Sequence, residues 1–206
     1  MSDGFVYIAE HGRGISLTEL KSSLGTIGLQ LANPANGVIA TINEEGNQCE
    51  VSEATLAEIL KTAPLTNFQF WFSDSSDLFL TIRQIPRGIT SLSFWVSASY
   101  GPEYQLACQW AAHRFCELAK LDSAALFVID RFGMTADFDW DGFPGNPGPL
   151  PKMPPEVLGF DQRIIHISTA DLIGLETRSV NNCLLSYDPA FGIAWEEEGG
   201  GWLRYP

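Results

Sequence analysis

The sequence lacks long apolar runs. Its longest clean stretch, Ala124–Ile129, is far shorter than the ~20 residues that a membrane-spanning helix needs. The first residues, MSDGFVYIAEHGRG, carry an acid at Asp3 and no basic cluster followed by an apolar segment, which is not the pattern of a secretory signal peptide. The sequence therefore predicts a soluble, cytoplasmic protein that does not bind membranes.

Basic side chains are also scarce. Lys and Arg number 12 against 25 Asp and Glu, which gives a formal net charge of -13. A field of this sign repels phosphate groups. It argues against nucleic acid as a direct partner and favours a basic protein instead.

Cysteine is sparse, and its spacing forms no framework. The four cysteines are Cys49, Cys108, Cys116 and Cys183. Cys108 and Cys116 lie about two turns apart on a predicted helix, ~12 Å along its axis, beyond the ~7 Å over which two Cα atoms can be bridged. His113 points ~140° away from Cys108 around the same helix, so the pair cannot converge on zinc. We expect four free thiols and no metal site there.

Motifs of catalysis and cofactor binding are missing too. The chain has no G-x-S-x-G, P-loop, G-x-G-x-x-G or H-E-x-x-H sequence. Glu10 and His11 stand side by side in a predicted surface turn, where neighbouring side chains point apart. No catalytic residue, cofactor or metal is therefore assigned.

Helix signals are clear at three places. Ser16 with Glu19 forms a capping box before an apolar stripe of leucines, and Ser52 with Thr55 starts a second helix that runs toward Pro64. Pro102 at a first helical position opens a longer helix that extends to about Lys120.

Strand signals are strongest in the middle of the chain. NFQFWFSD, LFLTIRQI and ITSLSFWVS alternate with period two and are joined by turn residues, so they predict an antiparallel meander. Trp71 and Trp95 fall on the face opposite the predicted core residues, which are Phe68, Phe70, Phe72, Leu92, Phe94 and Val96. Further predicted strands are Phe5–Ala9, GLQLAN, GVIATIN, Ala124–Asp130, MTADFDWDG, QRIIHIS, CLLSYD and FGIAWEEE.

These elements predict an α+β fold, with an antiparallel sheet meander packed against a long central helix and two N-terminal helices. Residues 1–142 form the predicted main domain, and residues 143–156 a loop rich in Pro and Gly. Residues 157–206 supply C-terminal strands that we expect to pack on the same domain.

Three aspartates alternate in the segment TADFDWDG. Asp137, Asp139, Asp141 and Gly142 match the first six positions of a calcium-binding EF-hand loop, but its twelfth position is Gly148 where the loop needs glutamate. The same residues also fit an acidic edge strand with Phe138 and Trp140 pointing inward and the three aspartates pointing outward into solvent. Such a row either protects the edge from self-pairing or presents negative charge to a basic partner.

Taken together, the single acidic domain, the FQFWFSDSSDLFLTI meander, the long helix after it and the aspartate row resemble the immunity proteins of bacterial toxin systems. The resemblance implies a cytoplasmic protein that binds and neutralises a cognate toxin by covering a basic surface. The candidate partner-binding residues are Asp137, Asp139, Asp141, Trp71, Trp95, Glu196, Glu197 and Glu198.

Two other functions stay open from the sequence. One is an enzyme or ligand-binding domain whose site, without a linear motif, gathers near Asp130, Asp137 and His166. The other is an adaptor whose proline-rich loop docks into the aromatic groove of a partner.

Overall fold

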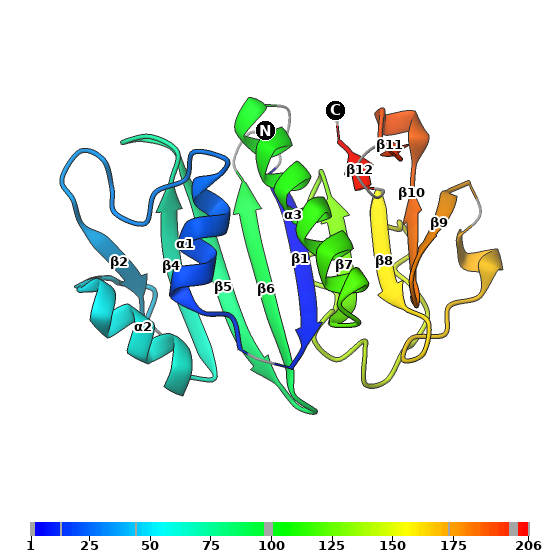
Figure 1. The fold of residues 1–206 in the computed structure, drawn as a ribbon, viewed down its shortest axis with the longest axis horizontal. Helices are drawn as coiled ribbons and strands as arrows, with labels where there is room; N and C mark the ends of the chain where they lie inside the picture. The colour runs from blue at the N-terminus through cyan, green and yellow to red at the C-terminus, as the bar shows by residue number, and fades with distance from the viewer. Residues whose placement is uncertain are drawn as a thin grey trace.

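The structure, a computed structural model, describes residues 3–12, 14–43, 45–96, 101–172, 174–197 and 202–205. Ten strands form one sheet in which every neighbouring pair is antiparallel (Figure 1). Their order across the sheet is β3 (Gln48–Val51), β2 (Ile39–Ile42), β4 (Leu65–Trp71), β5 (Asp77–Ile85), β6 (Ile89–Val96), β1 (Gly4–His11), β7 (Ala124–Asp130), β8 (Val157–Asp161), β10 (Cys183–Tyr187) and β9 (Glu176–Val180). The α+β class with a large antiparallel sheet is thus confirmed.

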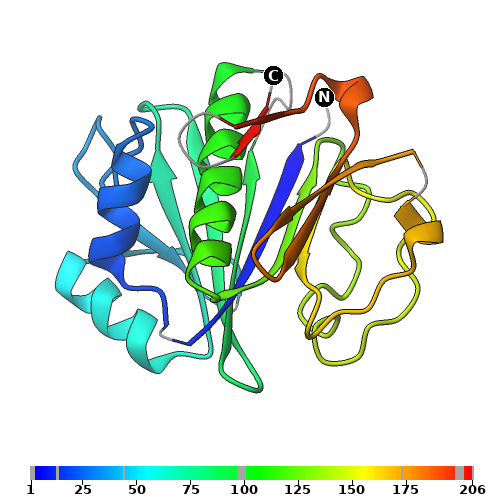
Figure 2. The same cartoon turned by 45° about the vertical axis from the view of Figure 1, so that its right-hand side comes forward.

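Three α-helices lie across one face of this sheet, which we call the first face (Figures 1 and 2). They are α1 (Leu17–Gly25), α2 (Glu53–Thr62) and α3 (Pro102–Lys120). The predicted starts are confirmed, because Ser16 accepts from the Glu19 N–H, Ser52 accepts from the Thr55 N–H, and Pro102 opens α3. A serine cap therefore marks the start of α1 and of α2, and a proline in the first turn marks the start of α3, which has no side-chain cap.

The first face carries the larger apolar core. Leu20 and Leu24 of α1, Leu56 of α2 and Phe115 of α3 are fully buried against it. The predicted core face of the meander is confirmed, since its residues from β4 and β6 are buried there, whereas Phe72 lies just beyond β4 and is only partly buried. A hairpin of β11 (Ala194–Glu196) and β12 (Trp202–Arg204) packs against α3, and its Leu203 enters the same core.

The opposite, second face has a different cover. Residues 131–156 and the described residues of 162–175, which are 162–172 and 174–175, fold over β1, β7 and β8 as turns and extended chain, with the short 3₁₀ helix η1 (Thr169–Leu172) in the second of these segments. They bury Trp140, Phe143 and Leu172 against the sheet. We call these two segments the loop layer. A second 3₁₀ helix, η2 (Pro189–Phe191), follows β10.

Several predicted strands are wrong. MTADFDWDG and QRIIHIS form turns and extended chain without strand pairing, and GLQLAN contributes only an isolated bridge between Gln30 and Trp71. In the part of FGIAWEEE that the structure describes, residues 191–197, the strand is limited to Ala194–Glu196. The alternation in MTADFDWDG does not distinguish a strand from a turn, because aromatic residues that alternate with acids can pack inward from either.

Strand β1 lies in the middle of the sheet. It pairs with β6 on one side and with β7 on the other, so that Phe5 stands between Trp95 and Asp130. It also runs two residues further than expected, which places Glu10 within the sheet and leaves it 7% exposed. The predicted surface turn at Glu10 is therefore wrong.

The four cysteines are free thiols, as predicted. Burial raises the pKa of the Cys116 thiol to about 11 and that of Cys183 to about 12, which keeps both protonated near neutral pH. Across the described part of the chain, no helix combines the length and apolar character needed to cross a membrane.

Candidate functional site on the second sheet face

One half of the second face is left open to solvent. Along β4, β5 and the second half of β6 the residues that alternate with the buried core are partly or fully exposed, in contrast to their neighbours on the first face, whereas Ile89 and Ser91 in the first half of β6 are buried. We call this the open half. It consists of Asn67, Gln69, Trp71, Phe79, Thr81, Arg83, Ser93 and Trp95.

A hollow of about 180 Å³ lies where the open half meets the loop layer. Its walls combine aromatic rings with hydroxyl and charged groups. The lining residues are Phe5, Tyr7, Thr81, Arg83, Ser93, Trp95, Ala136, Phe138, Asp139, Trp140 and Asp141. The hollow thus brings together three of the candidate residues chosen from the sequence, which are Trp95, Asp139 and Asp141.

Asp141 ties the loop layer to the sheet. Its carboxylate accepts hydrogen bonds from the Tyr7 hydroxyl at 2.9 Å and the Ser91 hydroxyl at 2.8 Å, and it pairs with Arg83 at 3.0 Å. Burial, followed by the charge of Asp141, raises the pKa of Tyr7 well above its usual value, so this hydroxyl stays protonated and donates. The prediction that Asp141 faces solvent freely is wrong, because its carboxylate has these three donors.

Asp137 and Asp139 behave differently from Asp141. Both are exposed, and Asp139 accepts from the Gly142 N–H at 2.9 Å within its own turn. Trp140 is 2% exposed, which confirms its predicted inward position, and its ring lies 4.5 Å from that of Phe138. The three aspartates therefore belong to one turn, in which Asp137 and Asp139 are exposed, while Asp139 and Asp141 line the hollow.

Trp95 is the most prominent aromatic side chain of the open half. It is 40% exposed, and its ring lies 5.2 Å from that of Phe5. Trp71 is only partly buried, and its main chain pairs with Gln30. Cross-strand pairing places Phe79 between Gln69 and Trp95 in one row, so the open half mixes aromatic and polar side chains.

The C-terminal acids belong to another part of the molecule. Glu196 ends β11 and lies 3.4 Å from Arg204 of β12, and Glu197 is exposed beside it. Their hairpin packs on α3 over the first face, so the structure does not bring them to the hollow. Glu198 lies outside the described residues.

The alternative site residues lie in separate local settings. Asp130 is buried at the end of β7 and accepts from the N–H groups of Phe132 and Thr135. His166 is exposed in extended chain. Among the described residues no hydrogen bond or ion pair joins Asp130, Asp137 and His166, and no group of three or more His, Cys, Asp or Glu side chains is placed to hold a metal.

Two polar clusters escaped the sequence analysis because their members are far apart along the chain. In the first, Arg114 of α3 pairs with buried Glu10 at 2.7 Å and with Glu19 of α1 at 3.2 Å. In the second, Glu156 accepts from the Arg131 N–H at 2.6 Å, and burial raises its pKa to about 7. Neither pair has a linear motif.

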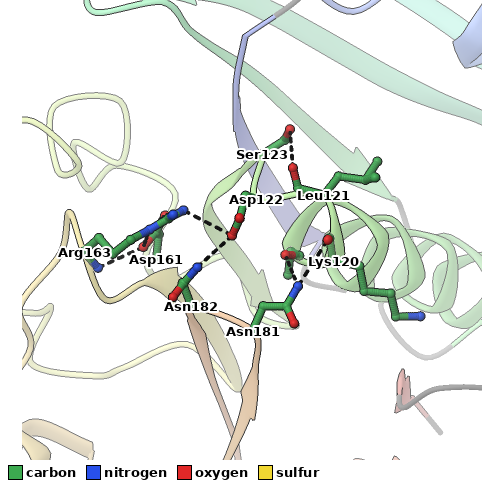
Figure 3. Close-up of polar contacts among 9 residues, drawn as sticks. Lys120, Leu121, Asp122, Ser123, Asp161, Arg163, Asn181 and Asn182 are labelled. Atoms are coloured by element: carbon green, nitrogen blue, oxygen red, sulfur yellow. Dashed lines mark hydrogen bonds and ion pairs between the residues drawn. The ribbon is translucent and has the colours of Figure 1, made fainter.

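A third cluster holds the end of α3 to the far strands (Figure 3). Asn181 donates to the carbonyls of Ala119 and Lys120 at 3.1 Å, and Asn182 donates to Asp122 at 2.8 Å. Fully buried Asp161 accepts from the Arg163 guanidinium at 2.6 Å. Although burial acts to raise it, these bonds lower the pKa of Asp161 overall. The arrangement satisfies helix carbonyls and a buried charge, which is a structural role.

No protein-family model matches the chain, and comparisons with curated proteins and with solved structures find no match.

Proposed function

We propose that this protein binds a basic partner protein through the open half and the hollow beside it, in the manner of an immunity protein that covers a toxin surface in the bacterial cytoplasm. The observation that carries the proposal is the position of Trp95, 40% exposed at a hollow whose lining also includes the exposed carboxylate of Asp139. Tryptophan beside a pocket is a common centre of binding energy in protein interfaces.

Charge around the hollow supports a basic partner. Arg83 is already paired with Asp141, whereas Asp137 and Asp139 are exposed carboxylates. The local balance is therefore acidic, in line with the formal net charge of -13. Complementary charge of this kind mainly speeds the encounter of two proteins and selects the partner.

The size of the hollow favours a side chain over a free ligand. Its volume of about 180 Å³ is below the ~300–1,000 Å³ of pockets that enclose small molecules. A single side chain of a partner would fill it, with the surrounding open half in contact around it. This argues against the ligand-binding alternative at this position.

The test starts with a pull-down from the native host, using the full chain as bait, followed by binding kinetics with the captured partner. A basic partner is expected, with association at least ~10-fold slower at 150 mM salt than at 10 mM, because screening shortens the reach of the charges. Trp95→Ala is expected to weaken binding by ~30-fold, the scale of an interface hot spot.

Two matched double variants distinguish the effect of charges on the second face from the effect of the overall net charge. The double variant Asp137→Lys with Asp139→Lys should slow association, whereas Glu58→Lys with Glu117→Lys makes the same charge change on exposed positions of α2 and α3. An acidic partner, or equal effects of the two double variants, would contradict the proposal.

A further inference from the structure

The ten-stranded sheet is open and ends in two edge strands, β3 and β9. Strand β9 pairs only with β10 in the described part of the chain, and its residues Glu176, Thr177, Arg178 and Ser179 are exposed. Figure 2 brings this end of the sheet toward the viewer. An exposed edge offers unpaired N–H and C=O groups to another strand.

The turn before β10 indicates which backbone groups face outward. Asn181 and Asn182 form a two-residue loop, so Val180 and Cys183 next to it make the hydrogen-bonded pair of the ladder. Alternation from that pair turns the N–H and C=O groups of Thr177 and Ser179 away from β10. The Thr177 carbonyl instead accepts from the Arg178 guanidinium at 3.3 Å, as expected for an outward-facing group.

The charged residues of β9 flank Thr177 with opposite signs, so two copies of the strand can match their charges. If two β9 strands pair in antiparallel fashion with Thr177 opposite Thr177, each Glu176 stands opposite an Arg178 of the other copy. Opposite charges and paired threonines across strands are stabilising. A register centred on Arg178 would instead oppose two arginines. The other edge has no such match, since Glu50 is the one charged residue of β3.

We propose that β9 is the contact of a symmetric homodimer, in which the two sheets join edge to edge with Thr177 on the two-fold axis. Isologous pairing of this kind is the usual symmetry of dimers. Strands of five residues bury little area compared with a standard interface of ~1,600 Å², so the dimer is weak and forms at ~0.1–1 mM protein. The acidic hollow lies on the sheet face and stays accessible in this arrangement.

Sedimentation equilibrium of the full chain tests the dimer. The unmodified protein is expected to dimerise at high concentration, and Arg178→Glu and Glu176→Arg are each expected to weaken dimerisation by at least ~10-fold through like-charge pairs. An equimolar mixture of the two variants should recover a heterodimer, because it restores two opposite-charge pairs. Lys61→Glu, which makes the same charge change as Arg178→Glu on exposed α2, should dimerise normally.

Thr177→Pro gives an independent check. Its N–H faces outward, so proline is tolerated by the β9–β10 pair but removes a donor from the edge. Circular dichroism confirms that each variant is folded. The proposal is overturned if the unmodified protein stays monomeric at 1 mM, if Thr177→Pro dimerises normally, or if folded Arg178→Glu and Glu176→Arg do not associate when mixed. In these cases the charges only protect the edge.

Discussion

The two faces of the sheet are covered by layers of different kinds. The first face is covered by three helices whose starts are marked by a serine cap or a proline, and the second by turns and extended chain that bury Trp140 and Phe143. Both layers exclude water from large apolar side chains. A segment with little regular structure can therefore form a core layer, and this layer leaves the open half exposed because it covers only part of the second face.

The largest loss of stability is expected when a buried aromatic side chain is removed from either layer. Trp140→Ala in the loop layer and Phe115→Ala on α3 should each lower the free energy of unfolding by about 3–5 kcal/mol, because both side chains are buried. Urea denaturation followed by circular dichroism measures both. A loss below about 1 kcal/mol for Trp140→Ala alone would show that the loop layer is not a core layer.

The next largest effect is a pH dependence of the free energy of unfolding, which arises from Glu156 in the loop layer. Burial raises the pKa of Glu156 to about 7, above the 4.5 of an unperturbed glutamate. Between these values the folded protein keeps a proton that the unfolded chain has released, so stability falls as pH rises through this window, by about 2–3 kcal/mol. Glu156→Gln, which keeps an acceptor for the Arg131 N–H, should remove most of this slope in denaturation curves from pH 4.5 to 8. An unchanged slope in the Glu156→Gln variant would show that other titratable groups cause the pH dependence.

The smallest effect concerns the boundary between the loop layer and the open half. Asp141→Asn should lower the free energy of unfolding by about 1–2 kcal/mol, since it weakens charge-assisted bonds from Tyr7, Ser91 and Arg83. Asp137→Asn, at an exposed position of the same turn, should change it by less than about 0.5 kcal/mol. Thermal denaturation of the two variants in parallel compares them, and equal values would contradict the anchoring role of Asp141.

The first layer could be predicted because its signals are local. Ser16 and Ser52 cap helices within three residues, and the period-two pattern of Phe68 and Phe70 sets the core face of β4. The loop layer could not be predicted in this way. Its anchor Asp141 reaches Tyr7 and Ser91, which are distant in sequence, and no local rule connects them.

The polar edge strands were missed for a related reason. The sequence of β9, ETRSV, has one apolar residue, and QCEV of β3 shows no clear alternation. Edge strands of this kind form because they pair with a neighbouring strand, and their own side-chain pattern does not reveal them. For the candidate site, Trp95 and Asp139 could be proposed from the sequence, but only the fold shows that they line one hollow while Glu196 lies elsewhere.

The central position of β1 has a consequence for biosynthesis. Gly4 pairs with Val96, and Phe5 pairs with Asp130, so this early strand waits for its neighbours until β6 and β7 have left the ribosome. Contacts between distant parts of a chain slow folding, and unpaired strands expose apolar surface in the meantime. In the nascent chain the apolar side chains of β1 therefore stay without their sheet partners until β6 and β7 emerge, which exposes a core strand to aggregation during synthesis.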